Sequence, residues 1–181
     1  MKKVFIESLD NIIINDELLD LVSYSDINMK KTSLKAWSFL NQKLKELYNI
    51  SIDNENIIYN EKGKPYLKND NIYFNISHSK DLIAIIIDSK ECGIDIEYID
   101  YERKIDKLIP RVLSPIEQMK FNKAVDKYEY FYKIWTIKEA YLKYIGTGIS
   151  FSTLATEQQY TNIISYICKY KKNKYYVSET K

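Results

Sequence analysis

The spacing of apolar and polar residues divides the chain into two series of elements. In the first series, Trp37, Leu40, Leu44 and Leu47 recur three and four residues apart and predict a helix over 28–48. Short apolar runs bounded by polar residues predict strands around this helix. The expected strands are 4–6, 57–59, 72–76, 82–88 and 92–98, and a short helix is expected over 16–22.

The second series begins near residue 100. Ser114, Pro115 and Glu117 predict a helix start, because serine suits the N-cap, proline the first turn and glutamate the capping box. A longer helix is expected over 127–145 and should end at Gly146, which can adopt the left-handed capping conformation. Strands over 163–170 and 175–178 are expected to close the chain.

Each series contains a helix-rich segment followed by strands. This order favours an α+β fold of two similar α/β lobes, each with a small, mostly antiparallel sheet packed on helices. We place the N-terminal lobe at 1–100 and the C-terminal lobe at 101–181. No linker rich in Pro, Gly or Ser separates them, so we expect the lobes to pack as one unit.

Composition and charge exclude several classes of protein. The chain of 181 residues is 45% hydrophobic and 29% charged, which is typical of a globular protein. The apolar run 82–87 is too short to cross a bilayer, and no signal peptide is visible, so we expect a cytoplasmic protein without a membrane partner. Two cysteines are too few for a disulfide scaffold or a zinc site. A dispersed net charge of +2 does not indicate a nucleic-acid partner.

Lysines alternate with tyrosines near the C-terminus. The stretch allows two interpretations: an edge strand protected by lysines, or an aromatic platform for single-stranded nucleic acid. We favour the edge strand. The residues concerned are Lys169, Tyr170, Lys171, Lys172, Lys174, Tyr175 and Tyr176.

Asp95 and Glu97 are two residues apart on a predicted strand, so both side chains should lie on one face while Ile94 and Ile96 face a core. Adjacent carboxylates repel each other unless a cation lies between them, and Mg²⁺ prefers such hard oxygen ligands. The strand alone is equally compatible with a solvated acidic face.

Glu139 and Lys143 share a helix face with Trp135. The pair by itself favours a surface ion pair beside a core tryptophan, worth a few tenths of a kcal/mol. In the functional interpretation, Glu139 is a third carboxylate and Lys143 is a cation that binds phosphate.

His78, the single histidine, lies between Ser77 and Ser79 at the end of a predicted strand. The chain has no nucleophile-elbow motif, so a binding site for an anion fits this segment better than a catalytic triad. Lys64 adds a cation on the turn Gly63–Pro65. Neither a Walker A loop nor a dinucleotide-binding glycine motif is present, which argues against ATP and dinucleotides.

Taken in order, these segments resemble the Sfp-type 4′-phosphopantetheinyl transferase family. The matching segments are GKP (63–65), FNISHS (74–79), GIDIE (93–97), LSPIE (113–117) and WTIKEAYLK (135–143), followed by GTG (146–148). The resemblance implies transfer of the 4′-phosphopantetheine of coenzyme A to a serine of an apo acyl or peptidyl carrier protein, with release of 3′,5′-ADP. The carrier would belong to fatty-acid, polyketide or nonribosomal-peptide biosynthesis.

The resemblance also implies roles for single residues. Asp95, Glu97 and Glu139 would hold Mg²⁺, or alternatively Mn²⁺, together with the pyrophosphate of coenzyme A. Lys143 would contact that pyrophosphate. Glu117 matches a glutamate proposed as the base for the incoming serine, although its capping box alone also explains a glutamate there.

The remaining implied contacts bind the nucleotide end of coenzyme A. Ser77 and His78 would grip the 3′-phosphate, and Lys31 and Lys35 stand about where the family has further basic residues for it. Lys64 would lie near the adenine.

The resemblance further implies the organisation of the whole chain. The N-terminal lobe would bind coenzyme A, the C-terminal lobe the metal and the carrier, and the site would lie at the junction of a monomeric pseudo-twofold pair. The alternative is a non-catalytic relative that binds coenzyme A or a carrier. All three candidate metal carboxylates are present, which favours the enzyme.

Overall fold

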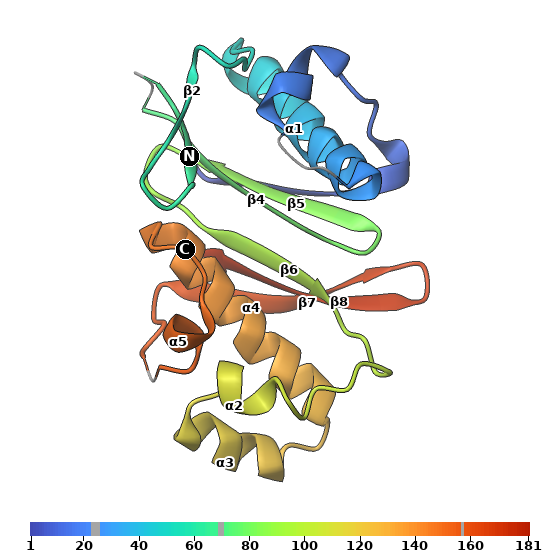
Figure 1. The fold of residues 1–181 in the computed structure, drawn as a ribbon, viewed down its shortest axis with the longest axis vertical. Helices are drawn as coiled ribbons and strands as arrows, with labels where there is room; N and C mark the ends of the chain where they lie inside the picture. The colour runs from blue at the N-terminus through green and yellow to red at the C-terminus, as the bar shows by residue number, and fades with distance from the viewer. Residues whose placement is uncertain (23–25, 69–70, 157) are drawn as a thin grey trace.

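The protein is built of four layers, a helix, two sheets and a second helix (Figure 1). The structure is a computed structural model that describes residues 1–22, 26–68, 71–156 and 158–181. The strands are β1 (Lys3–Ser8), β2 (Ile57–Tyr59), β3 (Pro65–Leu67), β4 (Tyr73–Ser79), β5 (Leu82–Asp88), β6 (Ile94–Tyr98), β7 (Ile163–Tyr170) and β8 (Asn173–Thr180). The α-helices are α1 (Ile27–Tyr48), α2 (Ile109–Val112), α3 (Pro115–Lys123), α4 (Lys127–Ile145) and α5 (Phe151–Leu154), and the 3₁₀ helices are η1 (Leu9–Asn11) and η2 (Asp16–Leu21).

The first sheet has the antiparallel order β1-β5-β4, and α1 covers its outer face (Figure 1). Every residue of the central strand β5 is buried, because apolar layers lie on both of its faces. Alternate residues contact the layer under α1, namely Ile83, Ile85 and Ile87. The others contact the layer between the two sheets, namely Leu82, Ala84 and Ile86.

The second sheet has the antiparallel order β6-β8-β7. Its central strand divides its side chains in the same way. Tyr175 and Val177 pack between the sheets, whereas Tyr176 packs with the apolar residues of α4 on the outer face. The two sheets therefore share one apolar layer, and each has a helix of its own.

Apart from η1, η2, β2 and β3 in the first half and α2, α3 and α5 in the second, both halves share one order of elements. Each contributes a first strand, a long helix and a hairpin whose second strand takes the centre of the sheet. The mixture of helices and small antiparallel sheets confirms the predicted α+β class. The first strand of the second sheet, β6, precedes residue 100 in the chain.

Side chains, not a backbone ladder, join the two sheets where β4 passes β6. We call this contact the seam, formed by Asn75, Ser77 and Ser79 of β4 and by β6. Asn75 Oδ1 accepts a hydrogen bond from the backbone N–H of Ile94 (3.0 Å), and Ser79 Oγ accepts one from that of Tyr98 (3.0 Å). Residues two apart on β4 thus align toward one neighbour, as strand geometry requires.

Most predicted elements are confirmed, and the differences are local. The predicted helices 28–48 and 127–145 are α1 and α4, and Gly146 caps α4 with a φ of 68°. The short helix predicted over 16–22 is the 3₁₀ helix Asp16–Leu21. Of the C-terminal stretch, β7 is an edge strand but β8 is central, so the edge interpretation holds for β7 alone. Among the described residues, no helix combines the length and apolar character needed to cross a bilayer.

Candidate functional site

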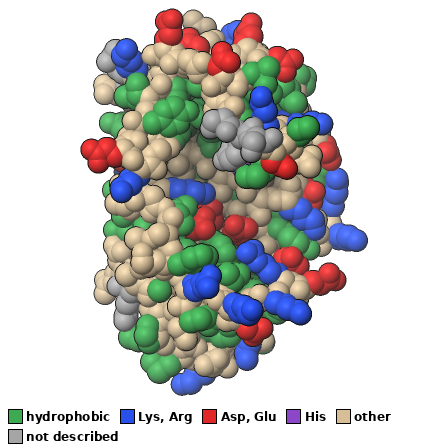
Figure 2. Space-filling view, in the orientation of Figure 1, with side chains coloured by type: hydrophobic (Ala, Val, Ile, Leu, Met, Phe, Trp, Pro, Cys, Tyr) green, Lys and Arg blue, Asp and Glu red, His purple; other side chains and the backbone are tan. Residues whose placement is uncertain are grey.

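Three carboxylates converge beside the seam. Asp95 and Glu97 extend from β6 and Glu139 from α4, and one oxygen of each lies within 4.8 Å of the others. Ile94 and Ile96 point the opposite way and are fully buried, as their alternation predicts. Asp95 is only 1% exposed, which rules out a solvated acidic face at this position. Figure 2 shows acidic side chains gathered in the hollow between the upper and lower halves.

Lys143 is the cation of this cluster. Its Nζ lies 2.6 Å from Asp95 Oδ1 and donates to Ser77 Oγ at 2.9 Å. Ser77 in turn donates to Asp95 Oδ1 (2.7 Å), and Ser79 donates to Glu97 Oε2 (2.9 Å). An ammonium has three N–H donors, and these contacts engage two of them. The pair with Asp95 shows that Lys143 does more than neutralise Glu139 on a helix surface.

The close approach of β6 to α4 depends on Gly93. A Cβ at this position would lie 2.2 Å from the Ala140 carbonyl oxygen and 2.5 Å from the backbone nitrogen of Tyr144. Only a residue without a side chain lets the two backbones approach so closely. This contact sets the distance between Asp95 on the strand and Lys143 on the helix.

Trp135 orients the third carboxylate. Its indole N–H donates to Glu139 Oε1 at 2.5 Å, one helical turn away. The ring is itself held in the core of the C-terminal half, edge to face with Phe131 at 5.3 Å between centroids. Glu139 therefore projects into the site from a fixed direction.

Burial and mutual repulsion perturb the ionisation of the cluster. Burial, followed by the charges of Asp95 and Glu139, raises the pKa of Glu97 to about 8. Burial and Asp95 also raise the pKa of Glu139 to about 7. Burial would lower the pKa of Lys143, but the charges of the three carboxylates outweigh it and raise that pKa. Three carboxylates thus share one ammonium, and burial together with their mutual repulsion keeps protons on Glu97 and Glu139 to a higher pH than usual.

A divalent cation fits this donor set. Asp95 Oδ2 is buried and has no hydrogen-bond partner among the described residues, which is costly for a carboxylate oxygen. The converging ligands are hard oxygens of the kind that Mg²⁺ and Mn²⁺ bind. Asp95, Glu97 and Glu139 are the residues that could hold the ion.

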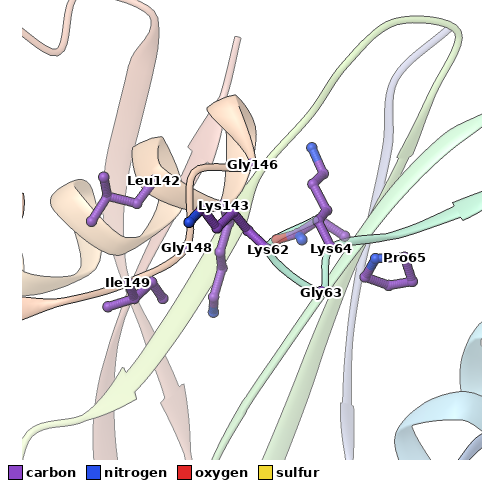
Figure 3. A pocket seen from close by; sticks show the side chains of 10 residues that line it. Lys62, Gly63, Lys64, Pro65, Leu142, Lys143, Gly146, Gly148 and Ile149 are labelled. Atoms are coloured by element: carbon purple, nitrogen blue, oxygen red, sulfur yellow. The ribbon is translucent and has the colours of Figure 1, made fainter. Parts of the chain in front are cut away.

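A pocket of about 250 Å³ opens next to Lys143. The turn Gly63–Pro65 forms one wall and the end of α4 at Gly146 the other, as Figure 3 shows. Asn75 and the apolar Leu142 and Ile149 contribute to its lining. A mixed pocket beside a cation is suited to a ligand with an anionic end and a flat or apolar body.

His78 lies on the other face of β4 from Ser77. It is exposed, and it lines a second pocket with Lys80 and with Thr32 of α1. Its pKa is lowered, first by partial desolvation of the ring and then by the charge of Lys143. The structure therefore does not bring Ser77 and His78 onto one surface.

The two predicted lysines of α1 differ in their surroundings. Lys31 is exposed one turn before Lys35. Lys35 is partly buried, and its ammonium donates to the backbone carbonyl of Leu9. The contacts of Lys35 in this structure are those of a residue that ties α1 to η1.

Lys64 is 8% exposed, and its ammonium is engaged by protein atoms. It donates to Glu91 Oε2 at 2.6 Å, to the Tyr144 carbonyl at 2.9 Å and to the Cys92 carbonyl at 3.3 Å. Lys64 lies on a wall of the pocket, and its charged end is turned to these acceptors.

Glu117 completes a capping box and a buried ion pair. Its Oε2 accepts from the backbone N–H of Ser114 (2.7 Å) and lies 2.5 Å from Lys138 Nζ. Lys138 is 1% exposed and also donates to the carbonyls of Val112 and Leu154. These contacts join α2, α3, α4 and α5, and they describe a structural role for Glu117.

Comparison with known proteins shows which family the second half of the chain is similar to. Residues 91–179 match the sequence profile of the 4′-phosphopantetheinyl transferase superfamily. This segment contains β6 and α4, and with them all three carboxylates and Lys143. This segment of the chain is therefore similar to the superfamily.

Individual relatives support the same assignment. The chain is 38% identical over 105 residues to "4′-phosphopantetheinyl transferase gsp" of Aneurinibacillus migulanus, covering 55% of this chain and 43% of the relative. It is 39% identical over 93 residues to a 4′-phosphopantetheinyl transferase of Bacillus subtilis, covering 50% and 41%. It is 34% identical over 113 residues to "4′-phosphopantetheinyl transferase AcpT" of Escherichia coli K12, covering 60% and 57%. The matches to the first two relatives span less than half of their length.

The sequence analysis did not predict a role for three residues that position the carboxylate cluster. Asn75 braces β6, Ser79 orients Glu97, and Gly93 permits the close contact with α4. The alternation of Asn75, Ser77 and Ser79 along one strand is the signal that could have indicated a shared polar face.

Proposed function

We propose that this chain transfers the 4′-phosphopantetheine of coenzyme A to a serine hydroxyl of an apo acyl or peptidyl carrier protein and releases 3′,5′-ADP. The observation that carries the proposal is the cluster of Asp95, Glu97, Glu139 and Lys143 inside the segment that matches the superfamily. The names of the relatives describe the same transfer group.

The residues of the site suit this reaction. Attack on a phosphorus atom of the pyrophosphate requires neutralisation of charge on the phosphoryl oxygens and the leaving group. Lys143 supplies a fixed cation, and its contacts to Asp95 and Ser77 engage two of its three N–H groups among the described residues. Mg²⁺, held by the three carboxylates, would supply further neutralisation of charge.

We assign the pocket between Lys64 and Gly146 to the nucleotide of coenzyme A. It adjoins Lys143, so a ligand there can direct its phosphates toward the carboxylates. The proposed contacts of the 3′-phosphate remain Ser77, His78, Lys31 and Lys35. Because the exposed His78 lies beside Thr32 in the second pocket, we favour that pocket for the 3′-phosphate.

We also propose the organisation of the whole molecule. Residues 1–100 form the coenzyme A-binding lobe and 101–181 the metal- and carrier-binding lobe, with β6 passing from the first range into the second sheet. The same order of elements in both halves supports a pseudo-twofold relation. We propose a monomeric, cytoplasmic enzyme, and the unpaired thiols of Cys92 and Cys168 suit a reducing compartment.

Intact mass spectrometry tests the proposed function. The protein is incubated with coenzyme A, Mg²⁺ and apo-carriers from fatty-acid, polyketide and nonribosomal-peptide systems. We expect one phosphopantetheine per carrier, no gain with EDTA and recovery with excess Mg²⁺ or Mn²⁺. A carrier whose acceptor serine is replaced by alanine is the control. Binding of coenzyme A without a mass gain on any carrier would instead support a non-catalytic relative.

A further inference from the structure

The hairpin of β2 and β3 is fastened to the end of α4 that carries Lys143. Lys64 donates to the carbonyl of Tyr144, the residue after Lys143. Asn60 Nδ2 donates to the carbonyl of Gly146 at 2.9 Å. Both acceptors lie at the C-terminal end of the helix, where carbonyls lack partners within the helix and a cation is favourable.

The same lysine also holds the start of β6. Its third hydrogen bond goes to the carbonyl of Cys92, directly before Gly93 and three residues before Asp95. One ammonium therefore joins the two backbone segments that supply Asp95 and Lys143. These segments are the pair whose close contact depends on Gly93.

All three donors of Lys64 are used. The acceptors are Glu91 Oε2 and the carbonyls of Cys92 and Tyr144, and an ammonium has three N–H groups and no acceptor. A phosphate or adenine could bind this ammonium only by displacing one of these partners. Lys143, with two donors engaged, differs in this respect.

The packing around Gly146 is independent evidence that the β2–β3 hairpin is held against the C-terminal end of α4. A Cβ there would lie 3.0 Å from Asn60 Nδ2, 3.2 Å from Tyr66 Oη and 3.3 Å from Lys64 Cδ. Asn60 Oδ1 also accepts from the backbone N–H groups of Lys62 and Lys64, each at 2.9 Å, and so shapes the turn that presents Lys64. The hairpin and the helix end are thus in direct contact.

We infer that Lys64, assisted by Asn60, is a positioning residue that sets Lys143 and Glu139 against Asp95 by holding the end of α4 to the start of β6. Its effect on turnover rests on the proposed transferase function. Lys64 affects the transition state by keeping Lys143 in position. Its own ammonium does not contact the nucleotide.

The variant Lys64→Met tests this inference, because it keeps the aliphatic stem and removes the donors. Glu91 is 42% exposed at its side chain and becomes solvated when the lysine is lost, so we expect the variant to fold. We expect kcat to fall on the order of 10- to 100-fold with KM for coenzyme A nearly unchanged, because a small displacement of a catalytic group costs turnover. Lys64→Arg should recover part of kcat. Lys68→Met, at an exposed lysine of the same hairpin, is the matched control and should change neither constant.

A second variant and a second measurement keep the test independent of activity. Asn60→Asp keeps the acceptor that shapes the turn but replaces the donor to Gly146 by a carboxylate oxygen that repels this carbonyl, so it should lower kcat in the same direction. Hydrogen exchange should become faster at 142–148 and 92–96 in Lys64→Met while the rest of α4 stays protected.

The outcomes separate this inference from the proposed function. A rise in KM for coenzyme A with unchanged kcat would make Lys64 a nucleotide contact and overturn the inference. Unchanged exchange at the end of α4 would overturn it whether or not transfer occurs. An inactive wild-type protein would remove the proposed function, and exchange would then decide whether Lys64 holds the two segments together.

Discussion

At the scale of single residues, Asp95 is the most constrained group of the site. Oδ1 accepts from Ser77 and Lys143, whereas Oδ2 is buried without a partner among the described residues. One oxygen is thus committed to the protein and the other is available to a cation. This division of roles distinguishes Asp95 from an ordinary buried ion pair.

The variant Asp95→Asn should abolish transfer while the protein remains folded. The amide lacks the negative charge of the carboxylate and is a weaker ligand for Mg²⁺, so we expect a rate loss of at least two orders of magnitude, about 3 kcal/mol in the barrier. The melting temperature without metal should stay the same or rise, because the repulsion of Glu97 and Glu139 is relieved. Mass spectrometry and calorimetry measure the two effects, and near-normal transfer would contradict the metal assignment.

The role of Glu117 is a second question at this scale. The same side chain closes the capping box, pairs with Lys138 and is the proposed general base. In Glu117→Gln the amide can still accept from Ser114, but the buried charge of Lys138 loses its counter-ion. We expect a loss of about 1–3 kcal/mol in the free energy of unfolding, and turnover per folded molecule close to normal.

Denaturant unfolding and carrier modification together decide the role of Glu117. A stability unchanged by Glu117→Gln, combined with a rate loss of two orders of magnitude or more, would identify the base. Mutation of Glu129, a partly exposed residue in the first turn of α4, to Gln is a control for removal of one helix-terminal charge.

At the scale of elements, the contact of β6 with α4 determines the geometry of the site. Gly93→Ala would place a methyl group against the Ala140 carbonyl and the Tyr144 backbone, so the helix must move. We expect a loss of about 1–3 kcal/mol in stability, as for other overpacked sites, and a clear fall in kcat.

Gly63→Ala is the contrasting variant for this experiment. Gly63 has a φ of 84°, but no atom lies within 4 Å of the place that a Cβ would take, so only backbone strain of about 1–2 kcal/mol is expected. Thermal unfolding and kcat of both variants are compared. Equal stability and equal kcat for Gly93→Ala and the wild type would show that helix and strand can separate without consequence.

The sequence predicted elements better than their contacts. Apolar periodicity located α1, α4 and β5, because burial on a helix face or within a sheet leaves a regular pattern. The short strand Pro65–Leu67 has no such pattern and depends on pairing with β2. The helices Ile109–Val112 and Phe151–Leu154 are single turns held by tertiary contacts, which include the bonds from Lys138.

The same limit applies to the site. The spacing of Asp95 and Glu97, and of Glu139 and Lys143, predicted two local faces, but no local rule brings a strand and a helix together. Their convergence depends on Gly93, and the bond from Lys64 to Tyr144 joins residues that are 80 positions apart in the chain. Order and resemblance, not spacing alone, indicated one site.

At the scale of the whole molecule, the cluster makes stability depend on pH. Glu97 and Glu139 ionise near pH 4.5 when unfolded but near 8 and 7 in the folded protein. Below pH 4.5 both groups are protonated in either state, and their contribution to folding is fully present. As pH rises toward 8 the unfolded state releases protons first, so these groups progressively destabilise the metal-free fold.

Unfolding at a series of pH values measures this dependence. We expect the stability contribution of the cluster to decline from about pH 5 to pH 8 without metal. Mg²⁺ should oppose the decline, with its largest effect at the upper end, because it binds the ionised carboxylates. Glu97→Gln should flatten the metal-free curve, and an identical curve in this variant would contradict the raised pKa of Glu97.

The seam has a consequence for how such a centre can be adjusted. The neighbouring edges of the two sheets meet through Asn75 and Ser79, and Ser77 between them touches Asp95. The backbone ladders pair strands of the same sheet, so only side chains link the sheets at this seam. The spacing of the two sheets beside the carboxylates therefore depends on the lengths of these three side chains as well as on the apolar layer that the sheets share.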